Sequence, residues 1–141
     1  MIEQRHVVIA HAAGYIARGW TNISPARDKD DKATFPEAPE ACKWSICGAV
    51  ERAWNNQSND ELFRGGEGRA NMDDVFGEIG MHLTNTCRWL HENVHRFNTM
   101  SFGFSKQIEL WEAMHERTQK EVFEMLIECV RARMVVREET F

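Results

Sequence analysis

The sequence lacks the long apolar run that a membrane-spanning helix requires. Nowhere among its 141 residues do about 18 or more apolar side chains follow one another. The N-terminal stretch is amphipathic and too polar for the apolar centre of a signal peptide. We therefore expect no transmembrane helix, no membrane partner and a cytoplasmic location.

An excess of basic residues is also missing. The chain has 17 Lys and Arg against 22 Asp and Glu, which gives a formal net charge of -5. Proteins that bind nucleic acid or a membrane surface generally carry a basic footprint. This charge balance predicts that the partner is not a nucleic acid.

Clustered cysteines are missing as well. Of the four cysteines, only Cys42 and Cys47 lie close together in the sequence, and on a helix their spacing would point them about 140° apart. In a reducing cytosol all four cysteines are expected to be free thiols.

What the sequence does contain is a sustained helical pattern. Hydrophobic residues make up 43% of the chain, enough for one core, and the length suits one helical domain over residues 1–141. Apolar residues recur at intervals of three and four, which is typical of amphipathic helices. We predict a mostly α, compact single-domain bundle of four main helices (4–18, 39–57, 71–98 and 121–136), a short helix at 105–114 and a small β-hairpin near residues 25–36.

Residues 39–57 are predicted to form the central helix. Ile46 and Val50 fall on one face of it, and Cys47 and Gly48 are small enough to let other backbones come close. Since a glycine inside a helix costs about 1 kcal/mol relative to alanine, Gly48 indicates such a close approach. We expect the two long apolar helices to sandwich this one.

The stretch 71–98 is predicted to be a single long helix, with a kink or break at Gly77 and Gly80 because glycine weakens a helix interior. His6 and His11, in or near the first helix, are predicted to be ordinary surface or boundary histidines.

Two signals predict where other helices end and begin. Gly19 follows the first helix as a C-cap. Thr118 and Glu121 have the spacing of a capping box, which predicts the start of the last helix.

Several short motifs occur together in an order and at spacings that resemble a known family. They are Gly19-Trp20, Ala26-Arg27-Asp28, Trp44-Ser45-Ile46-Cys47-Gly48-Ala49, Trp111, and Arg117-Thr118 with Glu121-Val122. This set resembles the small bacterial and phage proteins catalogued as domain of unknown function 6197, whose pattern runs G-W, A-R-D, W-C-x-x-G-A, W-N-D and R-T-x-x-E-V. Ser45 stands where that family has cysteine, and Glu112-Ala113 stands where it has Asn-Asp. The resemblance implies a fold and a phage or bacterial setting, but no activity.

The sharpest catalytic pattern is H-E-x-x-H at residues 91–95. In this pattern His91 and His95 would share a zinc ion as helical neighbours, and Glu92 would activate the zinc-bound water as general base. A third ligand would have to come from elsewhere, such as His115, Glu112 or Glu116. A small zinc-dependent hydrolase is therefore the alternative interpretation, because a pattern with three fixed positions arises easily by chance and no substrate-binding edge strand is predicted.

The leading interpretation is a non-catalytic protein, without a cofactor, that binds another protein. Exposed aromatic residues are typical of contact surfaces, so Trp89, Phe102 and Phe104 are predicted contact residues. Arg27 and Asp28, a charged pair in a loop, are also predicted to belong to the binding surface. The sequence is compatible with a homo-oligomer. The phage-like resemblance suggests an inhibitor of a host defence system, such as an anti-CRISPR protein.

Overall fold

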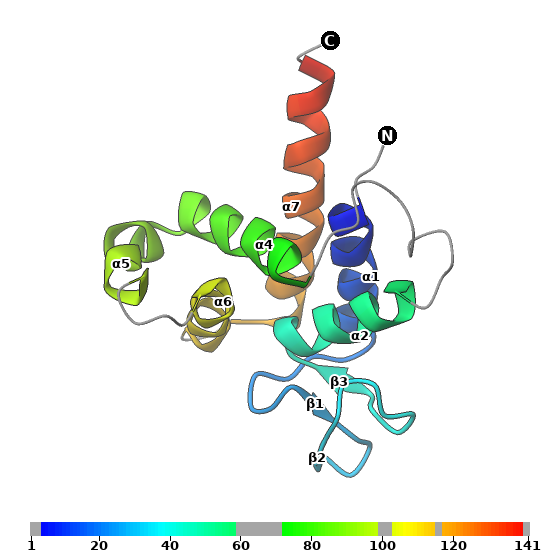
Figure 1. Ribbon diagram of the computed structural model, residues 1–141. Helices are drawn as coiled ribbons and strands as arrows, with labels where there is room; N and C mark the ends of the chain where they lie inside the picture. Colours follow the sequence, from blue (N-terminus) through cyan, green and yellow to red (C-terminus); the bar gives the residue numbers. More distant parts are fainter. Residues whose placement is uncertain (1–3, 59–71, 99–102, 115–116, 140–141) are drawn as a thin grey trace.

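The computed structural model describes residues 4–58, 72–98, 103–114 and 117–139. These residues form a mostly helical structure with a small three-stranded antiparallel sheet at one end (Figure 1), which confirms the predicted fold class. In chain order the elements are α1 (Gln4–Arg18), β1 (Ala26–Arg27), β2 (Ala33–Thr34), β3 (Lys43–Trp44), α2 (Ile46–Ser58), α4 (Met72–Thr86), α5 (Arg88–Asn98), α6 (Gly103–Ala113) and α7 (Gln119–Glu139).

The helix α1 has the bounds that its apolar period predicts, and it packs against α2, α4, α7 and β3. The N–H of Gly19 donates to the carbonyl of Tyr15 at 3.2 Å, so the helix ends where the glycine predicted. His6 corrects a prediction, because this histidine is only 4% exposed and its Nε2 lies 3.9 Å from the Glu78 carboxylate on α4. The buried side chains of α1 are His6, Val8, Ile9, Ala12, Ala13 and Ile16.

The predicted hairpin is confirmed and belongs to a larger sheet. The strand β1 lies between β2 and β3 and is antiparallel to both, with Ala26 opposite Thr34 on one side and Trp44 on the other. The strand β3 was missed, because a two-residue strand is too short to show a period.

The helix α2 begins at Ile46, so the prediction that it spans residues from 39 onward was wrong. Residues 39–45 include β3 instead. The N–H of Trp44 donates to the carbonyl of Gly19 at 3.1 Å, and this bond helps to hold the chain extended until the helix starts.

Gly48 confirms the predicted close approach. A Cβ atom added at this buried position would lie 1.9 Å from the backbone oxygen of Pro25, so only glycine fits. The helix α2 contacts α1, α4, α6 and β3. The prediction that the two long helices would both pack against this central helix was wrong for α7, which packs mainly on α1.

Within the single helix predicted for residues 71–98, the described residues 72–98 form two helices, and the break lies at Cys87. Just before it, the hydroxyl groups of Thr84 and Thr86 donate back to the carbonyls of Gly80 and His82, at 2.9 and 2.8 Å. Such back-bonding competes with the helical ladder and bends helices, which accounts for a break here.

The helix α4 is continuous through Gly77 and Gly80, where the sequence predicted a kink. Both glycines face the ring of Phe104 on α6, and a Cβ at Gly80 would come within 2.6 Å of that ring. The glycines therefore make room for the neighbouring helix.

The capping box at the start of α7 is confirmed, since the N–H of Glu121 donates to the Thr118 hydroxyl at 3.2 Å. Next to it, the Arg117 guanidinium lies 3.8 Å from the ring centroid of Trp111 and pairs with the Glu121 carboxylate at 3.0 Å. These contacts tie α6 to α7.

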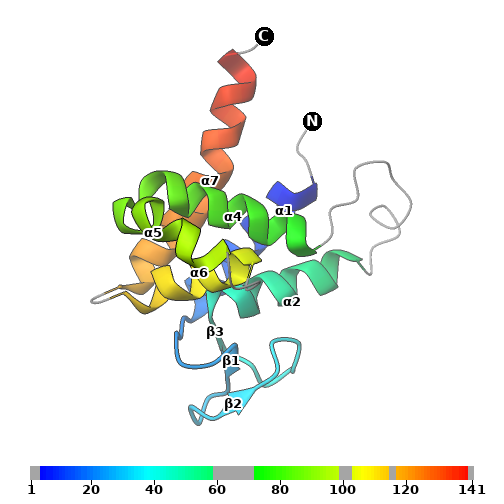
Figure 2. The same ribbon diagram turned by 60° about the vertical axis from the view of Figure 1, so that its left-hand side comes forward.

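The C-terminal half of α7 extends beyond the other helices in both views (Figures 1 and 2). None of the described helices, α7 included, has the length and apolar character needed to cross a bilayer.

Candidate functional site

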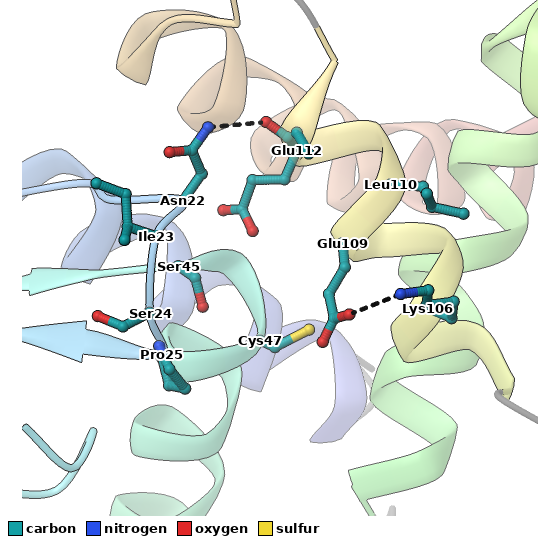
Figure 3. Close-up of a pocket in the computed structure, with 11 residues that line it drawn as sticks. Asn22, Ile23, Ser24, Pro25, Ser45, Cys47, Lys106, Glu109, Leu110 and Glu112 are labelled. Carbon is teal, nitrogen blue, oxygen red and sulfur yellow. Dashed lines mark hydrogen bonds and ion pairs between the residues drawn. The ribbon is translucent and has the colours of Figure 1, made fainter. Parts of the chain in front are cut away.

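A pocket of about 390 Å³ lies where three segments meet: the loop between α1 and β1, the start of α2, and α6 (Figure 3). A volume of this size falls within the usual range of small-ligand pockets. The residues that line it are Asn22, Ile23, Ser24, Pro25, Ser45, Cys47, Lys106, Glu109, Leu110, Glu112 and Ala113.

Glu112 is the central polar group of this pocket. The side chain is 3% exposed, and its Oε2 accepts two hydrogen bonds, one from the indole N–H of Trp20 at 2.8 Å and one from the backbone N–H of Ile46 at 2.7 Å. Since Ile46 is the first residue of α2, the carboxyl group caps a free N–H of that helix from another element. One side chain thus joins three segments that are distant in the sequence.

Burial has the largest effect on the pKa of this carboxyl group. It raises the pKa of Glu112 to about 7, the hydrogen bonds from Trp20 and Ile46 act in the opposite direction, and the nearby Glu109 raises the pKa further. A carboxyl group with such a pKa exchanges its proton near neutral pH, which is unusual for glutamate.

The start of α2 carries a second cap, from Ser45. The Ser45 hydroxyl accepts a hydrogen bond from the N–H of Gly48 at 3.0 Å, and the Ser45 carbonyl accepts the first helical bond, from Ala49, at 2.8 Å. Serine is among the preferred N-cap residues. The serine that replaces the family's cysteine therefore suits the helix start.

Cys47 lines the same pocket but is a poor nucleophile. Burial, followed by the negative charges of Glu112, Glu109 and Glu51, raises the pKa of the Cys47 thiol to about 12. Because the thiolate is the reactive form, this thiol is inert at neutral pH. Cys47 is a free thiol, as the sequence predicted.

The outer part of the pocket combines charged and apolar side chains. The Lys106 ammonium group lies 3.9 Å from the Glu109 carboxylate, and both side chains are partly exposed. Ile23 lines the pocket although it is 72% exposed, and Phe35, just after β2, is 79% exposed. Exposed apolar side chains that gather in one patch are typical of contact surfaces.

The residues of the H-E-x-x-H pattern lie elsewhere, on α5. His91 and Glu92 are exposed, and Glu92 pairs with Arg88 at 3.0 Å on the same helix. The side chain of His95 lies outside the described residues, as do His115 and Glu116. Among the described side chains, no group of three metal-binding residues lies together, and the zinc hydrolase stays a prediction.

The predicted aromatic contact residues have different environments. Trp89 is 47% exposed on α5, and Phe104 is 40% exposed in the first turn of α6. Phe102 lies outside the described residues. Phe104 also packs on Gly77 and Gly80 of α4, so part of its ring is committed to holding α4 against α6.

Arg27 and Asp28 do not pair with each other. The Arg27 guanidinium donates to the carbonyl of Asp31 in the turn, and the Asp28 carboxylate accepts from the N–H groups of Asp30 and Lys32 at 2.9 and 3.0 Å. Asp31 has a φ of 60°, which aspartate tolerates better than most residues. These contacts shape the β1–β2 turn, in a part of the molecule away from α5 (Figure 1).

Fold and pocket together define a small, mostly helical protein in which short sequence motifs meet around a buried carboxyl group. The chain belongs to a family of unknown function, DUF6197, whose model matches residues 4–132. Comparisons with curated proteins and with solved structures found no match. The resemblance based on the sequence motifs is thereby confirmed.

In the fold, residues from several of the family motifs lie close together. Trp20 of the G-W motif and Ile46 beside Trp44 both donate to Glu112, and Trp111 carries the stacked Arg117 of the last motif. In this chain the motif residues Trp20, Ile46, Trp111 and Arg117 make contacts between segments.

Sequence reasoning did not predict the role of Glu112. One signal was available, because Glu112 follows Ile108 by four residues and therefore lies on the buried face of α6. A glutamate on an apolar helix face needs a partner in the core, and here the partners are Trp20 and the start of α2.

Proposed function

We propose that this chain is a non-catalytic protein that binds another protein in the cytoplasm, through the pocket around Glu112 and the apolar side chains beside it. The single observation that carries the proposal is the exposure of Ile23, a large apolar side chain that lines the pocket. A concave site with exposed apolar neighbours is a common form of protein contact surface.

The state of the polar groups in the pocket supports binding rather than covalent catalysis. The Ser45 hydroxyl is engaged as a helix cap, and the high pKa of Cys47 keeps its thiol protonated. Neither group has a described histidine beside it to act as a general base, as nucleophilic catalysis by serine or cysteine requires.

The narrower role that we propose is the inhibition of a host defence system, of the kind that an anti-CRISPR protein performs. The phage and bacterial setting implied by the family resemblance supports this role. The partner would then be a component of that defence system, and the inhibitor would act by covering a surface of it.

The test is to capture a partner protein on the immobilised chain and to compare variants at the proposed binding surface with a control variant elsewhere on the protein. Replacing Ile23 and Phe35 together by serine removes the exposed apolar groups, and Met81→Ser, at a residue on α4 that is 50% exposed, is the matched control. Exposed positions like these tolerate substitution within about 0.5 kcal/mol. The captured protein is identified, purified and titrated against each variant.

We expect the double variant to bind the purified partner at least about tenfold more weakly, a loss of about 1.4 kcal/mol, and Met81→Ser to bind like the wild type. Equal binding by the double variant, or no partner that binds after purification, would overturn the proposal.

A further inference from the structure

We infer that the pocket around Glu112 receives a cationic side chain, an arginine of the protein partner, with Glu112 and Glu109 as its anionic contacts. This inference rests on the proposed function, because it names the chemistry of the partner at the same site. Four observations carry it: an uncompensated buried carboxyl group, a free acceptor atom, a negative potential, and apolar walls.

Glu112 has no cation of its own. Among the described residues, no Lys, Arg or His is paired with its carboxyl group, and its partners are two neutral N–H groups. The other strongly buried glutamate, Glu78, is 6% exposed and does have a cation, Arg5, at 3.1 Å. Since buried charges are ordinarily paired, Glu112 lacks a counterion that Glu78 possesses.

The hydrogen bonds to Glu112 leave one oxygen atom available. Both donors use Oε2, and Oε1 accepts no hydrogen bond from the described residues. Figure 3 shows the carboxyl group pointing from α6 into the space between the loop and α2. A guanidinium group, with its fork of N–H donors, suits a carboxylate of this kind.

The electrostatic potential in the pocket is negative, and the raised pKa of the Cys47 thiol is consistent with it. Three glutamates, Glu112, Glu109 and Glu51, all act to raise the pKa of this thiol. Among the described residues that line the pocket, the one cation is Lys106, and its ammonium group lies 3.9 Å from the Glu109 carboxylate. Two carboxylates against one ammonium group leave the pocket short of positive charge.

The walls suit the stem of a long basic side chain. Ile23, Pro25, Leu110 and Ala113 line the pocket and would contact the methylene groups, while the charged end reaches Glu112. Arginine and lysine commonly bury their stems in this way. Arginine is preferred to lysine because a guanidinium group is more weakly hydrated and is enriched at protein interfaces.

Protonation of Glu112 would oppose binding. Around it, Glu109 of α6 acts on its pKa, Lys106 of α6 and Cys47 of α2 line the same pocket, and Glu51 of α2 lies near Cys47. Trp20 from the α1–β1 loop adds no charge. A bound cation favours the ionised carboxylate, so affinity should fall as the pH falls through about 7.

The test uses the purified full chain, labelled with ¹⁵N, and the probe acetyl-arginine methylamide at pH 8. The indole N–H of Trp20 and the amide N–H of Ile46 report on the site because both donate to Glu112. Acetyl-citrulline methylamide, a neutral probe of nearly the same shape, is the control ligand. Probe concentrations up to about 50 mM detect a millimolar Kd.

We expect saturable shifts of both signals with the arginine probe and none with the citrulline probe. Glu112→Gln keeps one acceptor oxygen for the N–H groups of Trp20 and Ile46, replaces the other oxygen by an NH2 donor and removes the charge, so it should weaken binding at least about tenfold. Glu92→Gln, at an exposed carboxylate on α5, should change nothing. As a second measurement, without any variant, wild-type affinity should fall at least about tenfold between pH 8 and pH 5.5.

No saturable shift, or equal affinity for the Glu112→Gln variant, would overturn the inference. If free butylguanidinium binds as tightly as a Leu-Arg-Leu peptide, the pocket is a site for small cations and the assignment to a partner side chain is wrong. Tighter binding of the peptide supports that assignment. These titrations need no partner protein, so their outcome is independent of the capture experiment. If the arginine probe does not bind but the Ile23 and Phe35 double variant loses its captured partner, the assignment of an arginine is wrong and the proposed function stands.

Discussion

Two side chains fix the residue at which α2 starts. Ser45 caps the N–H of Gly48 from within the chain, and Glu112 caps the N–H of Ile46 from α6. Each cap satisfies a donor that the helix itself leaves free. The start of α2 is therefore set partly by a local residue and partly by a distant one.

The serine cap can be tested alone. Replacing Ser45 by alanine removes the acceptor for the Gly48 N–H, and we expect the free energy of unfolding to fall by about 1 kcal/mol. Urea denaturation measures this loss. Ser45→Thr keeps a hydroxyl cap and should recover most of the stability, whereas a loss as large as that of the alanine variant would argue against capping.

Two glycines in helices make a matched pair for the close approach at α2. Gly48→Ala places a Cβ 1.9 Å from the backbone oxygen of Pro25, and we expect a loss of at least about 2 kcal/mol because backbone must move. Gly14→Ala on the exposed side of α1 meets nothing within 4 Å, and we expect a gain of up to about 1 kcal/mol from helix propensity. Similar thermal stabilities for the two variants would refute the close contact.

Whole elements are coupled through Glu112, and this coupling makes stability depend on pH. The pKa of Glu112 is raised to about 7 in the folded chain from 4.5, so the folded state holds the proton more tightly than the unfolded state. The stabilisation is fully present below pH 4.5 and is lost as the pH rises through 7.

We predict that the free energy of unfolding of the wild type falls by up to about 3 kcal/mol between pH 4.5 and pH 8, relative to that of Glu112→Gln, whose side chain cannot titrate. Urea denaturation at a series of pH values, with Glu92→Gln as a control for an exposed carboxylate, measures this difference. A wild type and a Glu112→Gln variant whose stabilities run parallel over this range would contradict it.

Helix bounds with a local apolar period or cap signal could be predicted from the sequence, whereas a strand held by a distant partner and a break inside a continuous apolar period could not. The bounds of α1, the hairpin and the capping box at Thr118 follow from local residues. The strand β3 depends on pairing with β1, and the break at Cys87 depends on the hydroxyl groups of Thr84 and Thr86. Period alone does not carry either kind of information.

The same limit applies to the site. Gly48 could be interpreted correctly because glycine in a helix signals a close approach by itself. Glu112 could not, because its role needs Trp20 and Ile46 to be placed beside it in space. The burial of His6 was missed for the same reason, since the contact with Glu78 joins two helices that are far apart in the chain.

In the whole molecule, one buried carboxyl group joins the loop after α1, the start of α2 and α6, and it lies beneath the pocket that we propose as the binding site. The exposed apolar side chain of Ile23 lines the same pocket. Folding and binding would thus share a single titrating group.

The most direct test of this account is the pKa of Glu112, measured by NMR from its side-chain carboxyl carbon and from the Trp20 indole N–H over a pH series. The account predicts that both signals titrate together near pH 7. A carboxyl carbon that titrates near 4.5, with no response at Trp20, would mean that Glu112 is neither buried nor bonded to the start of α2, and would contradict the site.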